Sequence, residues 1–245
     1  MVHDFAVIVG LTNVADSLAA IEKVVFNDKK ATLKEIINAI DADWEGFSVL
    51  HQLVLQAPKY GNDDDLADRL ATRVHHETAR VMAEFKDRFG HSMRGDGSGV
   101  SATYGLALHT PATPDGRKNG EPFADATLSP SQGRDKKGPT AVLKSASKID
   151  TTRTFNHLLN QKFSPAMLQG HMKDAFQSYL RTWGDLGISH VQFNIIDRET
   201  LIDAQKNPQK HQNLIVSVAG YSAYFIDLSK GLQDSIIART EQSFR

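Results

Sequence analysis

The chain contains no cysteine among its 245 residues, and this absence removes several kinds of chemistry at once. Disulfide bonds, thiolate metal sites and thiol nucleophiles are all excluded. Neither sign of charge is in excess, because 28 basic residues stand against 29 acidic residues. This balance gives no reason to expect nucleic acid or an anionic membrane surface as a partner.

Long hydrophobic runs are also missing. No apolar run approaches the roughly 20 residues needed to cross a bilayer. The N-terminal segment MVHDFAVIVG lacks the basic start and small-residue cleavage site of a signal peptide. We therefore expect a cytoplasmic protein with no membrane association. The length fits one large domain or two small ones, and no internal repeat or low-complexity segment is present.

Apolar residues at helical spacing predict a helix-rich chain. Thr12 or Asn13 is expected to cap a first helix with apolar positions at Val14, Leu18, Ile21, Val24 and Val25. Thr32 and Glu35 have the spacing of a capping box and mark a second helix. Further helices are expected over 45–56, 66–89 with a stop at Gly90, 140–148, 169–186, from 198 to the break at Asn207-Pro208, and after Ser229 as a cap.

Alternating apolar and polar residues predict strands between these helices. We expect strands over Val100–Leu108, Leu158–Phe163 and His190–Ile196. The last of these ends at Asp197, which can cap the following helix. Alternating helices and strands indicate an α/β protein.

Two polar clusters were considered as metal sites. Asp63, Asp64 and Asp65 precede a helix, where the positive end of the helix dipole favours acidic residues, so we interpret them as a charged cap. His75, His76 and Glu77 lie within that helix. Adjacent helical side chains point about 100° apart, so the two histidines are poorly placed to share one ion. We expect no metal site at either position.

The segment from Thr110 to Pro139 is rich in glycine, proline and polar residues, and a loop of this length is usually functional or covers a site. Pro114-Asp115-Gly116 has the composition of a tight turn. For Arg117 and Arg134 we favour a role in tying the loop to carboxylates or carbonyls over direct substrate contact.

Near the C-terminus, Gly220 interrupts an apolar run and is followed by the aromatic segment Tyr221–Phe225. A glycine at such a place bends a strand or permits close backbone approach, and the simplest interpretation is a packing bulge. The surrounding residues give a more specific one. Val218-Ala219-Gly220-Tyr221 and Asp227-Leu228-Ser229-Lys230 resemble the radical-bearing segment of the pyruvate formate-lyase and glycerol dehydratase superfamily of glycyl radical enzymes, although Ser217 stands where that family has arginine.

The long loop extends the resemblance. Its matching motifs are Thr113–Arg117, Gly120-Glu121-Pro122, Ala124-Asp125, Leu128-Ser129-Pro130, Gly133-Arg134-Asp135 and Gly138–Ala141, and Leu159–Phe163 follows. They look more like the dehydratase and decarboxylase branch than like pyruvate formate-lyase itself. The resemblance implies an α/β fold, namely the C-terminal portion of a ten-stranded barrel. It divides the chain into a partial barrel, 1–195, and a glycine radical domain, 196–245.

The resemblance also implies a role for Gly220. In the family, an S-adenosylmethionine-dependent iron–sulfur activase removes a hydrogen from this glycine, with no other bound cofactor and no metal in the chain. The Cα radical is shared with the adjacent amide groups and needs protection from oxygen and water, as expected in anaerobic metabolism. We expect this shield from Val216, Val218, Tyr221, Tyr224 and Phe225. Serine at position 217 would impair activation, because it lacks the charged fork of arginine.

The missing cysteine sets a limit on this chain. Enzymes of the family pass the radical to a cysteine in a separate loop, and that cysteine attacks the substrate. The chain is therefore expected to act only with a cysteine-bearing N-terminal chain, and to expose apolar barrel surface without one. Two alternatives are a spare part that replaces the damaged end of a full-length lyase, and an inactive relic.

Overall fold

The computed structural model describes residues 5–97 and 102–244. The α-helices are α1 (Leu11–Ile21), α2 (Leu33–Asp41), α3 (Ser48–Gln56), α4 (Asp65–Glu84), α5 (Ala102–Ala107), α6 (Pro139–Ser147), α7 (Met172–Asp185), α8 (Arg198–Lys206) and α9 (Lys230–Ala238). The strands are β1 (Phe5–Val7), β2 (Arg94–Gly97), β3 (Asn156–His157), β4 (Leu159–Phe163), β5 (Val191–Ile195), β6 (Ile215–Ser217), β7 (Ser222–Tyr224) and β8 (Glu241–Gln242). A π-helical segment, Glu22–Asn27, continues α1, and 3-10 turns cover Thr151–Arg153, Pro165–Leu168, Pro208–Lys210 and Phe225–Asp227. None of the helices within the described ranges is both long and apolar enough to cross a membrane.

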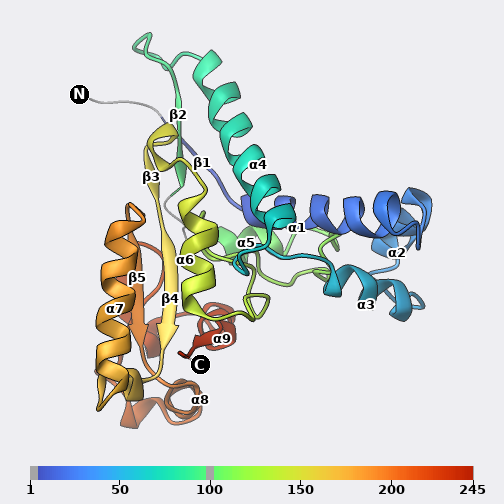
Figure 1. Ribbon diagram of the computed structural model, residues 1–245. Helices are drawn as coiled ribbons and strands as arrows, with labels where there is room; N and C mark the ends of the chain where they lie inside the picture. Colours follow the sequence, from blue (N-terminus) through green and yellow to red (C-terminus); the bar gives the residue numbers. More distant parts are fainter. Residues whose placement is uncertain (1–4, 98–101, 245) are drawn as a thin grey trace.

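Two small parallel sheets form the centre of the molecule, with strand orders β1-β2-β3 and β5-β4-β8. β3 continues into β4 with Leu158 alone between them, so one extended segment belongs to both sheets. In Figure 1 this segment descends through the left-hand part of the molecule, between α7 and α6. The predicted strands over 158–163 and 190–196 are confirmed as β4 and β5.

α6 and α7 cover one face of β4 and β5. Leu143 of α6, Phe176 and Tyr179 of α7 and Phe163 of β4 are buried together. The ring centroids of Phe163 and Phe176 lie 5.2 Å apart in an edge-to-face arrangement, which suits their quadrupoles. Both helices stand beside these strands in Figure 1. The apolar face of the C-terminal sheet is therefore filled, and its other face is left for the segments that follow α8.

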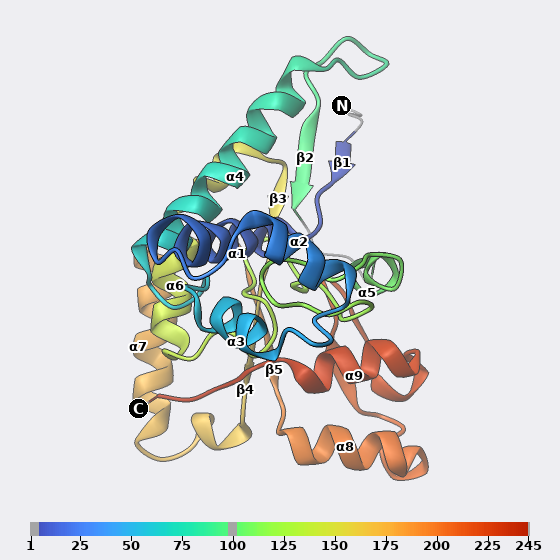
Figure 2. The same cartoon turned by 90° about the vertical axis from the view of Figure 1, so that its right-hand side faces the viewer.

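A second core lies between α8, α9 and the β6–β7 hairpin. Its buried centre is formed by Leu201 of α8, Val216 of β6, Phe225 of the 3-10 turn after β7, and Ile236 of α9. Figure 2 shows α8 and α9 side by side, with the chain after α9 passing away to the left toward the C-terminus. This core holds the base of the hairpin that carries Gly220.

The start of the first helix differs from the prediction. α1 begins at Leu11 with Gly10 as its N-cap, so neither Thr12 nor Asn13 is a cap. Both side chains are buried inside the fold: the Thr12 hydroxyl donates to the Ser129 carbonyl over 3.0 Å, and Asn13 donates to Asp115 over 3.0 Å. Residues that are typical of caps serve here to bind the long loop.

The buried face of α1 was also predicted wrongly. Ala15 and Ala19 are fully buried, whereas Val14 is 48% exposed and Leu18 is 39% exposed. The small side chains of Ala15 and Ala19 let α1 pack closely against α4. Val14 and Leu18, which the spacing predicted to lie in the core, face outward. Val24, in the π-helical segment, is buried as predicted.

The strand predicted over Val100–Leu108 is wrong for its described part, because residues 102–107 form α5; residues 98–101 lie outside the described ranges. Thr103 and Ala107, four positions apart, are buried, while Leu106 and Leu108 are exposed. The alternating apolar residues are therefore not the ones that the fold buries, and burial at a spacing of four is typical of a helix.

Most of the other helix predictions are confirmed. Thr32 and Glu35 form the predicted capping box, and Asp197 caps α8 by accepting from the Thr200 N–H over 2.7 Å. α3 begins at Ser48, three residues later than predicted. α4 ends at Glu84 and not at Gly90, because an antiparallel bridge between Lys86 and Ser92 takes over the backbone. Ser229 occupies the N-cap position of α9, but its side chain makes no capping hydrogen bond.

Candidate functional site

The site is built around Gly220, which lies in the turn of the β6–β7 hairpin. β6 and β7 pair antiparallel from Ile215 with Tyr224 to Ser217 with Ser222. Above the last pair, the Val218 N–H donates to the Tyr221 carbonyl over 2.8 Å and closes the turn. Gly220 has a φ of +80°, a left-handed conformation that strains other residue types. The predicted break in the strand is therefore a turn rather than a bulge.

A row of polar side chains from β4 and β5 forms the floor of the hairpin. The strands pair in parallel with Asn160 opposite Gln192, and successive side chains alternate between the two faces of the sheet. The face opposite α6 and α7 presents Asn160, Lys162, Gln192 and Asn194. Asn194 binds the Ser217 backbone twice: its amide donates to the carbonyl over 2.7 Å, and its oxygen accepts from the N–H over 2.7 Å.

Gly220 has its own contact in this row. Its N–H donates to the side-chain oxygen of Gln192 over 3.0 Å. Nearby, the Asn160 amide donates to the Val218 carbonyl over 3.5 Å, and the buried Lys162 ammonium donates to the Ile237 carbonyl over 3.3 Å. Burial lowers the pKa of Lys162. The floor thus fixes both the hairpin and the end of α9.

Arg239 braces the hairpin from the residue after α9. One guanidinium nitrogen donates to the Ser217 carbonyl over 2.9 Å, and another donates to the Val218 carbonyl. The third nitrogen pairs with the Asp125 carboxylate, and both side chains of this ion pair are 7% exposed. A planar guanidinium suits this arrangement because its donors form a rigid fork. Although position 217 carries serine, a guanidinium contacts its backbone from elsewhere in the chain.

The expected apolar shield around Gly220 is only half correct. Val216, Val218 and Phe225 are buried beneath the turn. Gly220 itself is exposed, Tyr221 is 44% exposed and Tyr224 is 46% exposed. Tyr221 lies in the turn and Tyr224 at the end of β7, and both side chains are at the surface. Within the described residues the turn is supported from below and open above.

The long loop, residues 108–138, contains no helix or strand, as predicted. Arg117 ties it together, donating to the carbonyls of Thr110, Pro111, Lys118 and Glu121. The preferred interpretation of Arg117 is confirmed. Arg134 and Arg117 both line a cavity of about 420 Å³, together with Asp115 and Asp234, and the role of Arg134 stays a prediction.

Two buried carboxyl groups connect the loop with the rest of the chain. Asp135 accepts from the Thr240 hydroxyl and the Gln242 amide next to β8. Burial raises the pKa of Asp135 to about 6, although both hydrogen bonds oppose the change. Burial also raises the pKa of Asp16 to about 7, while the nearby Lys59 lowers it. Both carboxyl groups lie within the packed interior and contact no residue of the Gly220 turn.

The two polar clusters considered for metal binding have structural partners. Asp64 caps α4 by accepting from the Leu66 and Ala67 N–H groups, which confirms the charged-cap interpretation. His75 lies 2.8 Å from His157, nitrogen to nitrogen, and burial lowers the pKa of each imidazole to about 4. Across residues 5–97 and 102–244, no group of three or more His, Asp or Glu side chains is placed to hold a metal ion.

The residues that hold Gly220 were not identified from the sequence. Gln192 and Asn194 lie two positions apart in a predicted strand, and Asn160 and Lys162 have the same spacing in another. This spacing places polar side chains on one face, which is the signal that was available. Arg239 offered no local signal, since its partners are 22 and 114 positions away in the chain.

Comparison with known families identifies the class of this site. Residues 124–226 match the family model "Glycine radical", and residues 2–106 match "Pyruvate formate lyase-like". The chain belongs to the glycyl radical enzymes and carries their glycine radical domain. The predicted fold is confirmed: the solved relatives are glycyl radical enzyme barrels, and this chain corresponds to a C-terminal portion of them.

The similar proteins act on different compounds. The isethionate sulfite-lyase of Bilophila wadsworthia is 43% identical over 94% of this chain and 28% of its own length. The hydroxyproline dehydratase of Clostridioides difficile, solved with trans-4-hydroxy-L-proline, has a TM-score of 0.93 and 38% identity over 99% of this chain and 31% of its own. The B12-independent glycerol dehydratase of Clostridium butyricum has a TM-score of 0.91 and 40% identity over 98% and 30%. The chain thus spans less than a third of the length of each relative.

Proposed function

We propose that this chain is the radical-bearing part of a glycyl radical lyase and stores the radical on Gly220. The observation that carries the proposal is the position of Gly220 at an exposed hairpin turn, within the segment matched by the glycine radical family. Residues 1–195 serve as the partial barrel and 196–245 as the glycine radical domain.

The chemistry starts with the loss of one hydrogen atom from the Cα of Gly220. That atom, a proton with one electron, passes to an S-adenosylmethionine-dependent iron–sulfur activase and leaves an unpaired electron on Cα. Gly220 then takes a hydrogen atom from the thiol of a cysteine on another chain, which becomes the thiyl radical that attacks substrate. The exposed turn supports this scheme, because the glycine is accessible to both partners.

The partner that covers the turn is proposed to be the cysteine-bearing part of the enzyme. The upper side of the turn exposes Tyr221 and Tyr224, so the shield from oxygen and water has to be completed from outside the described residues. Apolar surface is exposed elsewhere too: a groove of about 470 Å³ between α1 and α4 is lined by apolar residues including Leu18, Phe26 and Val74. Exposed patches of this kind mark contact surfaces.

The names of the relatives support a proposal for the general class of substrate, but not for one compound. Their names refer to isethionate, trans-4-hydroxy-L-proline and glycerol, three small polar molecules. We propose a lyase of the same branch acting on a small polar compound. The chain contributes the radical store, and the residues that distinguish one substrate from another belong to the complementary part.

The proposal is tested by electron paramagnetic resonance after anaerobic treatment with an activase. Wild type is expected to give a doublet centred on a glycine, and Gly220→Ala none. Gly90→Ala is a matched control, because Gly90 also lies in an open turn with a φ of +84°. A wild-type sample without the doublet, or a Gly220→Ala sample with it, would contradict the proposal. Thermal unfolding of each variant separates loss of the radical from loss of the fold.

The spare-part alternative and the relic alternative are distinguished from this proposal by binding. A split enzyme requires an intact cysteine-bearing chain, and its complex with this chain should be active after activation. A spare part should bind a full-length lyase only after oxygen has cleaved the end of that lyase. A relic, which Ser217 and the absence of cysteine both favour, should give no radical in either complex.

A further inference from the structure

The side chains that hold the glycine hairpin bind different parts of its backbone. Asn194 and Arg239 both bind the backbone of Ser217, three residues before the glycine. Gln192 binds the N–H of Gly220 itself. Gln192 and Asn194 are two residues apart on β5, so the alternation of the strand brings both to the hairpin. Asn194 and Arg239 set the position of the hairpin, and Gln192 acts at the glycine.

The conformation of Gly220 gives this contact a particular consequence. A Cα radical is stabilised by sharing its electron with the adjacent amide groups, which requires their planes to align with the trigonal Cα. On the nitrogen side the planes align when φ is near 180°. Gly220 has a φ of +80°, so its N–H plane is turned well away from alignment. A hydrogen bond to that N–H resists rotation about the N–Cα bond.

The space at the Cα of Gly220 is open. No atom outside the immediate chain neighbours lies within 4 Å of the place where a Cβ on Gly220 would stand. On the nitrogen side, the hydrogen bond from the Gly220 N–H to Gln192 over 3.0 Å acts on the amide plane directly.

We propose that Gln192 is a positioning residue that sets the orientation of the Gly220 amide and so the distribution of the unpaired electron. This inference rests on the proposed role of Gly220 as the radical site. Gln192 contributes its side-chain oxygen as an acceptor and exchanges no atom with the glycine. Its influence acts through the geometry of one hydrogen bond.

The first test uses the chain before activation. Hydrogen exchange of the Gly220 amide, followed by nuclear magnetic resonance, is expected to become about five- to tenfold faster in Gln192→Leu, as loss of one hydrogen bond implies. Gln192→Glu keeps an acceptor oxygen and should exchange like wild type. Gln177→Leu, the same change on the exposed face of α7, is the matched control. An unchanged Gly220 amide in Gln192→Leu, or an equal change in Gln177→Leu, overturns the inference.

The second test uses the activated chain. If Gln192 orients the amide, Gln192→Leu should give a glycyl doublet with an altered splitting, and Gln192→Glu should restore the wild-type splitting. A Gln192→Leu doublet identical to that of wild type overturns the positioning role while leaving the radical site intact. If wild type gives no doublet although the Gly220 amide responds to Gln192→Leu, the hydrogen bond is purely structural. That result rejects the radical site and the positioning role together.

Discussion

The long loop at 108–138 and the hairpin around Gly220 are both irregular backbone, but their polar groups are satisfied in different ways. Much of the loop is buried, including Asp115, Gly116 and Arg117, and Trp44, from the turn after α2, and His51 of α3 donate to its Arg117 and Gly116 carbonyls over 3.3 Å and 2.8 Å. Among the described residues the hairpin is bonded from one side, by Asn160 of β4, residues of β5 and Arg239, and its upper side is exposed. An enclosed loop supports a site, whereas an open turn is available for contact.

A buried ion pair links the two regions. Asp125 belongs to the loop, and Arg239, which binds the hairpin carbonyls, is its partner. A buried ion pair of this kind contributes little net stability, but it leaves an uncompensated charge when one partner is removed. The loop and the hairpin are therefore expected to lose their order together when this pair is broken.

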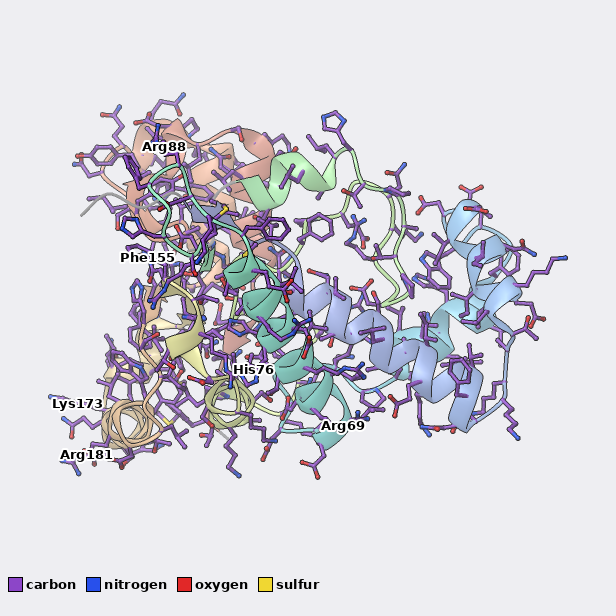
Figure 3. All side chains as sticks on the ribbon, turned by 90° about the horizontal axis from the view of Figure 1, so that it is seen from above. Arg69, His76, Arg88, Phe155, Lys173 and Arg181 are labelled. Atoms are coloured by element: carbon purple, nitrogen blue, oxygen red, sulfur yellow. The ribbon has the colours of Figure 1, made fainter. Side chains whose placement is uncertain are left out.

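The largest effect is expected from Arg239→Met. This change leaves Asp125 buried without its partner and removes one of the donors to each of the Ser217 and Val218 carbonyls, so we expect a loss of about 3–5 kcal/mol in the free energy of unfolding. Denaturant unfolding measures it. Arg181→Met is the matched control, because Arg181 projects from the outer face of α7 (Figure 3) and is exposed. The double variant Arg239→Met, Asp125→Asn should recover part of the loss, and a double variant that is no more stable than the single one would contradict the coupling.

Asp135 provides a smaller, pH-dependent test of the enclosed loop. Burial raises the pKa of Asp135 to about 6 from its ordinary value of 3.8. Between these values the folded state holds more protons than the unfolded state, so this group lowers the stability as pH rises from about 4 to about 6. Asp135→Asn does not titrate. The stability of Asp135→Asn relative to wild type should therefore increase across this window, by roughly 2–3 kcal/mol.

Urea unfolding at several pH values between 4 and 7 measures this difference. Taking the difference between variant and wild type removes other titrating groups, including the buried His75 and His157, whose lowered pKa values act in the opposite direction. Asp185→Asn, at the exposed end of α7, is the control. A relative stability that is flat across the window would show that Asp135 is not as enclosed as the loop geometry indicates.

The same comparison explains which features the sequence could predict. Asp64, Asp197 and the Thr32–Glu35 pair act on the backbone within three residues, so local spacing predicted them correctly. The composition of the loop and the motif around Gly220 were equally local signals. In all these cases the residues that interact, or that make up the motif, are close together in the sequence.

Features that depend on distant partners were missed. Thr12 and Asn13 have the composition of caps, but the loop more than 100 residues later takes their hydrogen bonds. α5 was predicted as a strand because its apolar residues alternate, although the positions it buries are four apart. The exposure of Tyr221 and Tyr224 depends on how the hairpin lies against the rest of the chain, which no single segment specifies. Tertiary contacts override local preference at each of these positions.

The smallest effect is expected at the open side of the hairpin. Tyr221 and Tyr224 are about half exposed, so Tyr221→Ser and Tyr224→Ser should each change the stability of the isolated chain by no more than about 0.5 kcal/mol. If a partner covers the turn, the same tyrosines become buried at the interface, where aromatic residues commonly carry much of the binding energy. Each variant should then weaken binding to the cysteine-bearing chain by about tenfold or more, as measured by isothermal titration calorimetry. The same change at the exposed Phe26, which lines the apolar groove between α1 and α4, tests whether that groove is part of the same interface. Equal affinity of the tyrosine variants and wild type would mean that the open side of the hairpin is not the surface that the partner covers.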